Sequence, residues 1–318
     1  MCFSEKSCNL KNYLSYAEFF TENMLSISII AGLIPMVCWG FADFLQSTVI
    51  RKLGVYKTIF LSNVMVLLMT IPFAFFSDLS VAYSNLFILF FGGITQTFSI
   101  FFFYESMRKG EISIVLPISA SYPIITVLLL WSLLGNTIGF VTGLSILILI
   151  LGVMLISTDL KKLKHLHTVA GVRESVYTLL LWGFYFFVLE VASKKTLLFG
   201  IDFPEMTFMS LFIYSYIFTS IFMLVFSIIK KGVLTKKDLK KNKKIVFREI
   251  YIQIIYLVSW LVLNYGFILG RAELIAPISS LYPAIAVILA IIFYKEKLVF
   301  NQKIGILTIL LGLFLISM

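Results

Sequence analysis

Apolar residues along the chain gather into ten runs separated by polar segments. The runs cover residues 27–49, 56–76, 85–107, 112–134, 137–157, 174–193, 206–229, 250–269, 273–294 and 301–317. An α-helix rises about 1.5 Å per residue, so about 20 residues cross the ~30 Å hydrocarbon core of a bilayer. The pattern therefore predicts an all-α integral membrane protein with about ten transmembrane helices.

Composition agrees with a membrane protein and changes the interpretation of the net charge. The chain is 60% hydrophobic and 13% charged, against roughly a quarter charged in soluble domains. The net charge of +10 suggests a nucleic-acid partner at first sight. However, the Lys and Arg residues lie between the apolar runs, as juxtamembrane charges do. We therefore expect membrane lipid as a partner and no nucleic acid.

Three segments fall outside the predicted spans. Residues 1–26 form a polar N-terminal extension, which we expect to be weakly structured up to residue 23 and not to be a signal peptide. Residues 158–173 form a basic connector, and residues 230–248 form a basic loop with Asp238 as its single acid.

An internal repeat occupies the two halves of the chain. Residues 110–123 read GEISIVLPISASYP and residues 270–283 read GRAELIAPISSLYP, which aligns them at an offset of 160. The same offset places LGVMLIS, starting at Leu151, on LGLFLIS, starting at Leu311. The spacing indicates a duplication, with a first five-helix repeat at 27–157 and a second at 174–318.

A second shared motif lies early in each half. Trp39-Gly40-Phe41 recurs as Trp182-Gly183-Phe184 at an offset of 143, and an insertion at the basic loop explains the change of offset. Because each repeat has an odd number of spans, the second enters the membrane from the opposite side. The two halves then form an inverted repeat, an architecture found in many secondary transporters.

These motifs resemble the drug/metabolite transporter superfamily, and in particular its EamA-like ten-helix branch. The resemblance rests on the early Trp-Gly pair and on a fourth helix with two prolines six residues apart in each half, and it covers about residues 25–318. One departure is that Glu296 follows the second such helix, whereas the first is followed by Gly135-Asn136. The resemblance implies a transporter with a central cavity bordered by the fourth and ninth helices, and leaves the substrate open.

The repeated proline motifs supply candidate cavity-lining residues. Prolines inside a span remove backbone donors and loosen the helix, so the freed carbonyls and nearby hydroxyls can face a ligand. The alternative is that the prolines shape packing and the hydroxyls satisfy those carbonyls. The predicted substrate-binding residues are Pro117, Ser119, Tyr122, Pro277, Ser279, Tyr282, Trp39, Trp182 and Asn264. Helix packing is the alternative for the two tryptophans, and interhelical hydrogen bonding for Asn264.

Acids inside spans are costly, by about 2.5 kcal/mol or more when unpaired. Glu105 has basic residues three and four positions later and Glu190 has Lys194, which predicts ion pairs at helix ends. Asp43 has no such neighbour. We expect it to face water, a ligand or a proton path, as a coupling or cation site; the alternative is an acid that is hydrogen-bonded locally near the membrane surface.

These features predict a secondary transporter that moves a small polar metabolite, such as an amino acid or amine, by alternating access. Proton coupling, nucleotide-sugar or sugar-phosphate substrates, and a membrane scaffold or lipid-handling protein are the alternatives that remain open. We find no metal-ligand cluster, phosphate loop or nucleophile–base arrangement, so we expect no enzyme activity, metal or cofactor.

Most Lys and Arg residues follow odd-numbered spans, which places both termini outside the cytoplasm, whereas members of the superfamily are usually described with cytoplasmic termini. We expect a monomer or homodimer in the plasma (inner) membrane.

Overall fold

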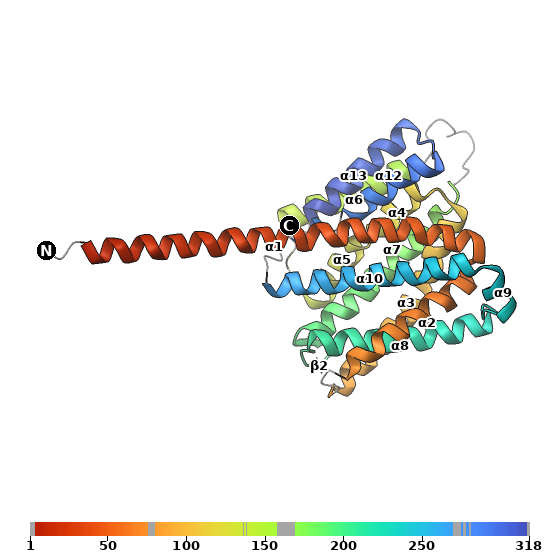
Figure 1. The fold of residues 1–318 in the computed structure, drawn as a ribbon, viewed down its shortest axis with the longest axis horizontal. Helices are drawn as coiled ribbons and strands as arrows, with labels where there is room; N and C mark the ends of the chain where they lie inside the picture. Colours follow the sequence, from red (N-terminus) through yellow and green to blue (C-terminus); the bar gives the residue numbers. More distant parts are fainter. Residues whose placement is uncertain are drawn as a thin grey trace.

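The computed structural model describes residues 4–75, 80–135, 137, 139–157, 169–269, 275, 278–279 and 281–316. The first half of the chain forms helices α1 (Ser4–Leu53), α2 (Val55–Ala74), α3 (Tyr83–Lys109), α4 (Ile112–Ala120), α5 (Pro123–Leu134) and α6 (Phe140–Ser157). The second half forms α7 (Val172–Ser193), strands β1 (Thr196–Leu198) and β2 (Ile201–Phe203), α8 (Phe208–Ile229), α9 (Lys236–Lys241), α10 (Lys243–Leu269), α12 (Tyr282–Tyr294) and α13 (Phe300–Ile316). Except for the short β1–β2 hairpin and α9, the described elements form a bundle of apolar helices (Figure 1).

The predicted all-α membrane architecture is confirmed. Within the described residues, seven helical segments are long and apolar enough to cross a membrane, and the helix pair α4–α5 counts as one of them. Three shorter apolar helices, Phe140–Gly152, Tyr282–Tyr294 and Phe300–Leu315, lie at the remaining predicted spans. Many large apolar side chains on these helices point outward, including Phe87, Phe140 and Leu307, as lipid-facing residues do.

The packing of the helices follows the two-fold relation that the repeat predicts. Helix α1 packs against α10 and α12, and its counterpart α7 packs against α3 and α5. Helices α6 and α13, which are counterparts of each other, pack together, as do α2 and α8. Each half therefore completes its packing on the other half, and the five-helix units are interlocked (Figure 1).

Glycines at repeated positions make these contacts close. A Cβ built on Gly40 would lie 2.5 Å from the carbonyl oxygen of Tyr282 and 2.6 Å from the Cβ of Ile285. A Cβ built on Gly183 would lie 2.9 Å from the carbonyl oxygen of Tyr122 and 2.3 Å from the Cβ of Ile125. Tyr122 and Ile125 correspond to Tyr282 and Ile285 at the offset of 160. The Trp-Gly motif of each half thus packs on the Tyr-Pro motif of the other half.

The N-terminal extension differs from its prediction as a weakly structured segment. Helix α1 runs without interruption from Ser4 into the first span, which begins at Ile29, and its first part projects away from the bundle (Figure 1). The segment before Gly32 contains no Gly or Pro. Because a helix that has already formed extends at little cost, the folded span propagates backward through such a sequence.

The basic loop 230–248 is also shorter than predicted. Helix α8 ends at Ile229, α9 forms a single turn with a Thr235–Asp238 capping box, and α10 begins at Lys243. The first turns of α10 carry lysines and lie before its apolar run. Long basic side chains can keep their charged ends in the interface, so the helix can begin there. This shift of the boundary brings Glu249 inside the helix.

Candidate functional site

The fourth span is broken at its proline motif, as predicted. Helix α4 ends at Ala120 and α5 begins at Pro123, with Ser121 and Tyr122 forming a turn between them. Ser119 is buried and its hydroxyl donates to the carbonyl of Val115 at 2.9 Å, and Ser121 donates to the carbonyl of Pro117 at 2.9 Å. The hydroxyls therefore satisfy carbonyls of their own helix here, which is the packing alternative for Ser119.

The predicted aromatic residues meet across the two halves. The rings of Trp39 and Tyr282 lie edge to face with centroids 6.0 Å apart, and those of Trp182 and Tyr122 also lie 6.0 Å apart, edge to face. Tyr122 additionally stacks on Phe186 at 4.4 Å. Tyr282 lies within electrostatic range of both Tyr122 and Asp43. The two Trp–Tyr contacts are thus equivalent, and each joins the first half of the chain to the second.

Asp43 lies deep in the first span and is buried. It stands ten residues before the end of α1 at Leu53, a distance of about 15 Å along the helix. The residue is only 5% exposed, and one of its carboxylate oxygens accepts a hydrogen bond from the Tyr256 hydroxyl of α10. Asp43 is therefore held between the halves, away from the membrane surface.

A second buried acid, Glu249, lies on the same interface between α1 and α10. Glu249 is 0% exposed, and its carboxylate accepts three hydrogen bonds. The donors are the Ser62 hydroxyl at 2.5 Å, the Gln253 amide at 2.8 Å and the Gln46 amide at 3.2 Å. We refer to Asp43, Glu249 and the four side chains bonded to them, Gln46, Ser62, Gln253 and Tyr256, as the carboxylate cluster.

No ion pair compensates the two acids within the described part of the chain. The neutral Tyr104 hydroxyl lies 3.4 Å from the Ser62 hydroxyl that donates to Glu249. The nearby cations are directed to other groups: Arg248 to Thr48, Arg51 to the Gly110 carbonyl and the Tyr294 ring, Lys57 to Asp238 and Lys109 to Glu174. Burial without a counter-charge favours protonation or cation binding, whereas hydrogen-bond donors favour the ionised carboxylate.

On the basic side of the bundle, Glu296 of the second half is hydrogen-bonded to the first half. Its carboxylate accepts hydrogen bonds from the backbone N–H groups of Ile112 and Ser113, at 3.0 and 2.9 Å, and from the Ser113 hydroxyl at 2.5 Å. These donors lie at the start of α4, where unpaired N–H groups and the helix dipole favour a negative charge. Glu296, which follows α12, thus caps the start of α4 in the other half. Burial and the charge of Glu296 raise the pKa of the neighbouring Glu111.

The predicted helix-end ion pairs are also present. Arg108 donates to Glu105 at 2.6 Å and Lys109 lies 3.4 Å from the same carboxylate. Lys194 pairs with Glu190 on the opposite side of the membrane.

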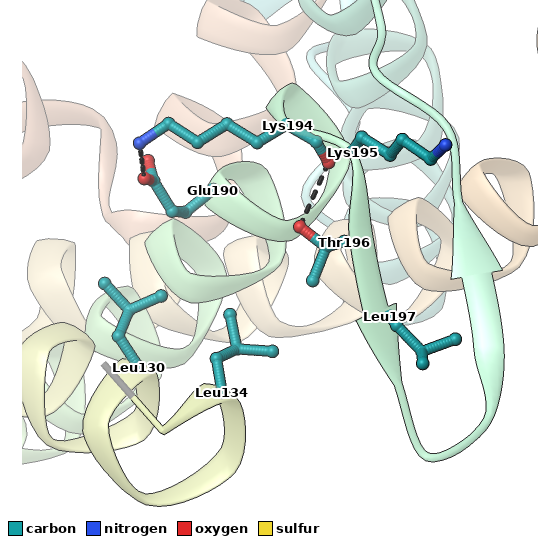
Figure 2. Close-up of a pocket in the computed structure, with 7 residues that line it drawn as sticks. All are labelled: Leu130, Leu134, Glu190, Lys194, Lys195, Thr196 and Leu197. Atoms are coloured by element: carbon teal, nitrogen blue, oxygen red, sulfur yellow. Dashed lines mark hydrogen bonds and ion pairs between the residues drawn. The ribbon is translucent and has the colours of Figure 1, made fainter.

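That second pair belongs to a surface cavity of about 320 Å³ between α5, α7 and β1, lined by Leu130, Leu134, Glu190, Lys194, Lys195, Thr196 and Leu197 (Figure 2). None of the predicted site residues lines it. The carboxylate in it is already paired, so the cavity offers no free charge of the kind found at the carboxylate cluster.

Two predicted residues cannot be placed. Pro277 and the side chain of Asn264 lie outside the described residues, whereas Ser279 is described and buried. Glu249 was not among the predicted site residues, because it was placed at the edge of a lysine-rich loop. A signal for it does exist: Glu249, Gln253 and Tyr256 follow one another at i, i+4 and i+7, which places them on one face of a helix.

Comparison with known proteins agrees with this architecture. The EamA-like transporter family matches residues 26–158 and again residues 175–318, so both halves match separately. An uncharacterized protein of Methanocaldococcus jannaschii is 38% identical over 76 residues, which are 24% of this chain and 56% of that protein. The chain thus matches only a little over half the length of this curated relative. Since the family match covers both repeats, the chain is a member of the EamA-like transporter family.

Proposed function

We propose that the protein is a secondary transporter that moves a small polar metabolite by alternating access between its two halves. The observation that carries the proposal is the interface itself: two buried carboxylates lie between interlocked, inversely repeated halves. Similar halves of opposite orientation permit two states of similar energy, each open to one side. Glu296 bridging to α4 represents the state that is closed on the basic side.

The charge at the centre favours a cationic or zwitterionic substrate, such as an amine or an amino acid. Asp43 and Glu249 are acids, and the nearest Lys and Arg side chains among the described residues are bonded elsewhere. An anion such as a sugar phosphate would enter a region that already has excess negative potential. The aromatic rings of Trp39 and Tyr282 beside Asp43 add surfaces on which a cationic group is favoured.

A thermal-shift screen of the detergent-purified protein tests this proposal. Amines, amino acids, nucleosides, nucleotide sugars and sugar phosphates are compared, since a ligand at 100 times its Kd adds ~2.7 kcal/mol to the folded state. We expect stabilisation by amines or amino acids, lost in Asp43→Asn and retained in Asp202→Asn, which alters an exposed acid of the β-hairpin. Stabilisation by phosphorylated anions alone, or hits that survive Asp43→Asn, would reject the assignment of the substrate.

We infer that the basic side faces the cytoplasm of the plasma membrane. The loops on this side hold most of the Lys and Arg residues, including all those between Ile229 and Glu249, and positive charge is retained on the cytoplasmic side. Attachment of a membrane-impermeant thiol reagent to Lys237→Cys in a Cys-free background checks this. Labelling from the outside of intact cells would reverse the orientation.

A further inference from the structure

We propose that Glu249 is the proton-binding group that couples a proton gradient to the movement of the two halves. The inference rests on the proposed transport function and extends it by naming the driving ion and the residue that carries it. It arises from the hydrogen bonds around Glu249, which suit both protonation states of the carboxylate.

The Ser62 hydroxyl makes this exchange possible. It has one hydrogen, yet its oxygen lies 2.5 Å from Glu249 Oε1 and 2.9 Å from the carbonyl of Thr58. When Glu249 is ionised, Ser62 donates to it. When Glu249 is protonated, the acid donates to Ser62, and Ser62 donates to Thr58 instead. The oxygen positions accommodate both arrangements without movement of the backbone.

Gln46 provides a second feature of the same kind. It is 0% exposed, its Nε2 donates to Glu249 Oε2, and its Oε1 has no partner within the described structure. A buried acceptor left without a donor costs free energy. If the proton lies on Oε2 instead of Oε1, rotation of the amide by half a turn would let Gln46 Oε1 accept it while Ser62 continues to donate to Oε1. The two arrangements are alternatives, because a protonated carboxyl carries one hydrogen.

The groups that face Glu249 include no cation that would hold it permanently ionised. On α3 the Tyr104 hydroxyl lies 3.4 Å from the Ser62 hydroxyl of α2, and on α10 the Tyr256 hydroxyl donates to Asp43 of α1. Ser62 and both tyrosines are neutral groups. The adjacent Arg248 donates to Thr48 at 2.8 Å. Burial therefore favours proton uptake by Glu249, and access to water on one side would favour release.

Protonation also changes how strongly the halves are joined. Two of the donors to Glu249, Ser62 and Gln46, belong to the first half, whereas Glu249 belongs to the second. Hydrogen bonds to an ionised carboxylate are roughly twice as strong as those to a neutral group. Proton binding would thus loosen one contact between the halves, and this links the proton to the conformational change.

The test has two arms, and the first does not depend on a substrate. The carboxylic C=O stretching band of the detergent-purified protein is followed by infrared spectroscopy across the physiological pH range. We expect a titrating band that is lost in Glu249→Gln and kept in the matched control Glu190→Gln, whose acid is paired at the membrane surface. Absence of a Glu249-dependent band would overturn the proposal and leave the transporter standing. If NaCl removed the band and choline chloride did not, the carboxylate cluster would be a sodium site, and the proton-binding role of Glu249 would be rejected.

The second arm uses vesicles that contain the protein and a trapped pH-sensitive dye, with the solutes that stabilised it in the thermal-shift screen. Wild type and Glu190→Gln should move protons on addition of solute. In Glu249→Gln the number of protons moved per solute exchanged should fall at least tenfold, with a melting temperature that shows that the variant is folded. An unchanged number of protons per solute exchanged in this folded variant would contradict the coupling role. Lack of exchange in the wild type would instead reject the transport function.

Discussion

The close contact at Gly183 predicts that one added methyl group will push α5 and α7 apart and destabilise the packing of the two halves. In Gly183→Ala the new Cβ would lie 2.3 Å from the Cβ of Ile125 and 2.9 Å from the carbonyl oxygen of Tyr122. Both atoms are fixed to the main chain of the fourth span, so rotation of a side chain cannot relieve the clash. Helices α5 and α7 must therefore move apart by more than 1 Å, judged from ordinary contact distances of about 3.5–4 Å.

The magnitude follows from two opposing effects. Overpacking of this kind costs about 3 kcal/mol, while replacing Gly by Ala inside a helix gains about 1 kcal/mol. The net loss of about 2 kcal/mol corresponds to a Tm lower by roughly 4–8 °C for a domain of 150–250 residues. Gly40→Ala should behave in the same way, because its Cβ would meet the equivalent atoms of Tyr282 and Ile285 in the other half.

Thermal unfolding in detergent, followed by intrinsic tryptophan fluorescence, measures this effect. Gly139→Ala is the matched control, because a Cβ at Gly139 would have nothing within 4 Å. Gly139 precedes the first residue of α6, so Ala gains no helix propensity there, and this variant should melt close to the wild-type temperature. If Gly183→Ala and Gly40→Ala melted with this control, the packing of the Trp-Gly motif on the Tyr-Pro motif would be refuted.

Two further predictions concern the basic side. Glu296→Ala removes a charged cap from the start of α4 and should destabilise the protein by about 1–2 kcal/mol, seen as a lower Tm. It should also increase thiol labelling of Ser113→Cys from the basic side, and unchanged labelling would argue against a gate here. The Lys57 ammonium, 2.8 Å away, and hydrogen bonds from Thr235 lower the pKa of Asp238 to about 2 from its ordinary value of 3.8. Because the ion pair favours ionised Asp238, its stabilisation is complete above the ordinary pKa and is lost as pH falls toward 2. Lys57→Met should therefore speed amide hydrogen exchange over 232–242 at neutral pH, and its difference from wild type should disappear in acid; a difference independent of pH would contradict this.

Much of the fold could be predicted because it depends on local pattern and on repetition. The lengths of the apolar runs define the spans, and the offset of 160 between Tyr122 and Tyr282 defines the two halves. The structure adds that Trp39 packs on Tyr282 and Trp182 on Tyr122. Sequence alone does not reveal this pairing across the halves, because it depends on how the two units dock.

The site could be predicted only in part for the same reason. Asp43 was identified because it lies within an apolar run without a nearby base. Glu249 was missed because α10 extends beyond its apolar run. Its burial also depends on Ser62 and Gln46, which lie 187 and 203 positions away in the sequence. Hydropathy is a property of a residue and its neighbours in the sequence. Whether a carboxylate can be buried depends on hydrogen-bond donors from other helices, which hydropathy does not describe.

The central claim is tested most directly by measuring solute uptake into vesicles that contain the protein with a reversible cross-link between its halves on the basic side. Ser113→Cys and Glu296→Cys are introduced together in a chain whose native cysteines are replaced by Ser, since the wild-type side chains are in contact. The solute is one that stabilises the wild-type protein. Alternating access predicts that the reduced protein transports the solute, that a disulfide across the contact abolishes transport, and that reduction restores it. Transport at the full rate with the cross-link in place would contradict the account.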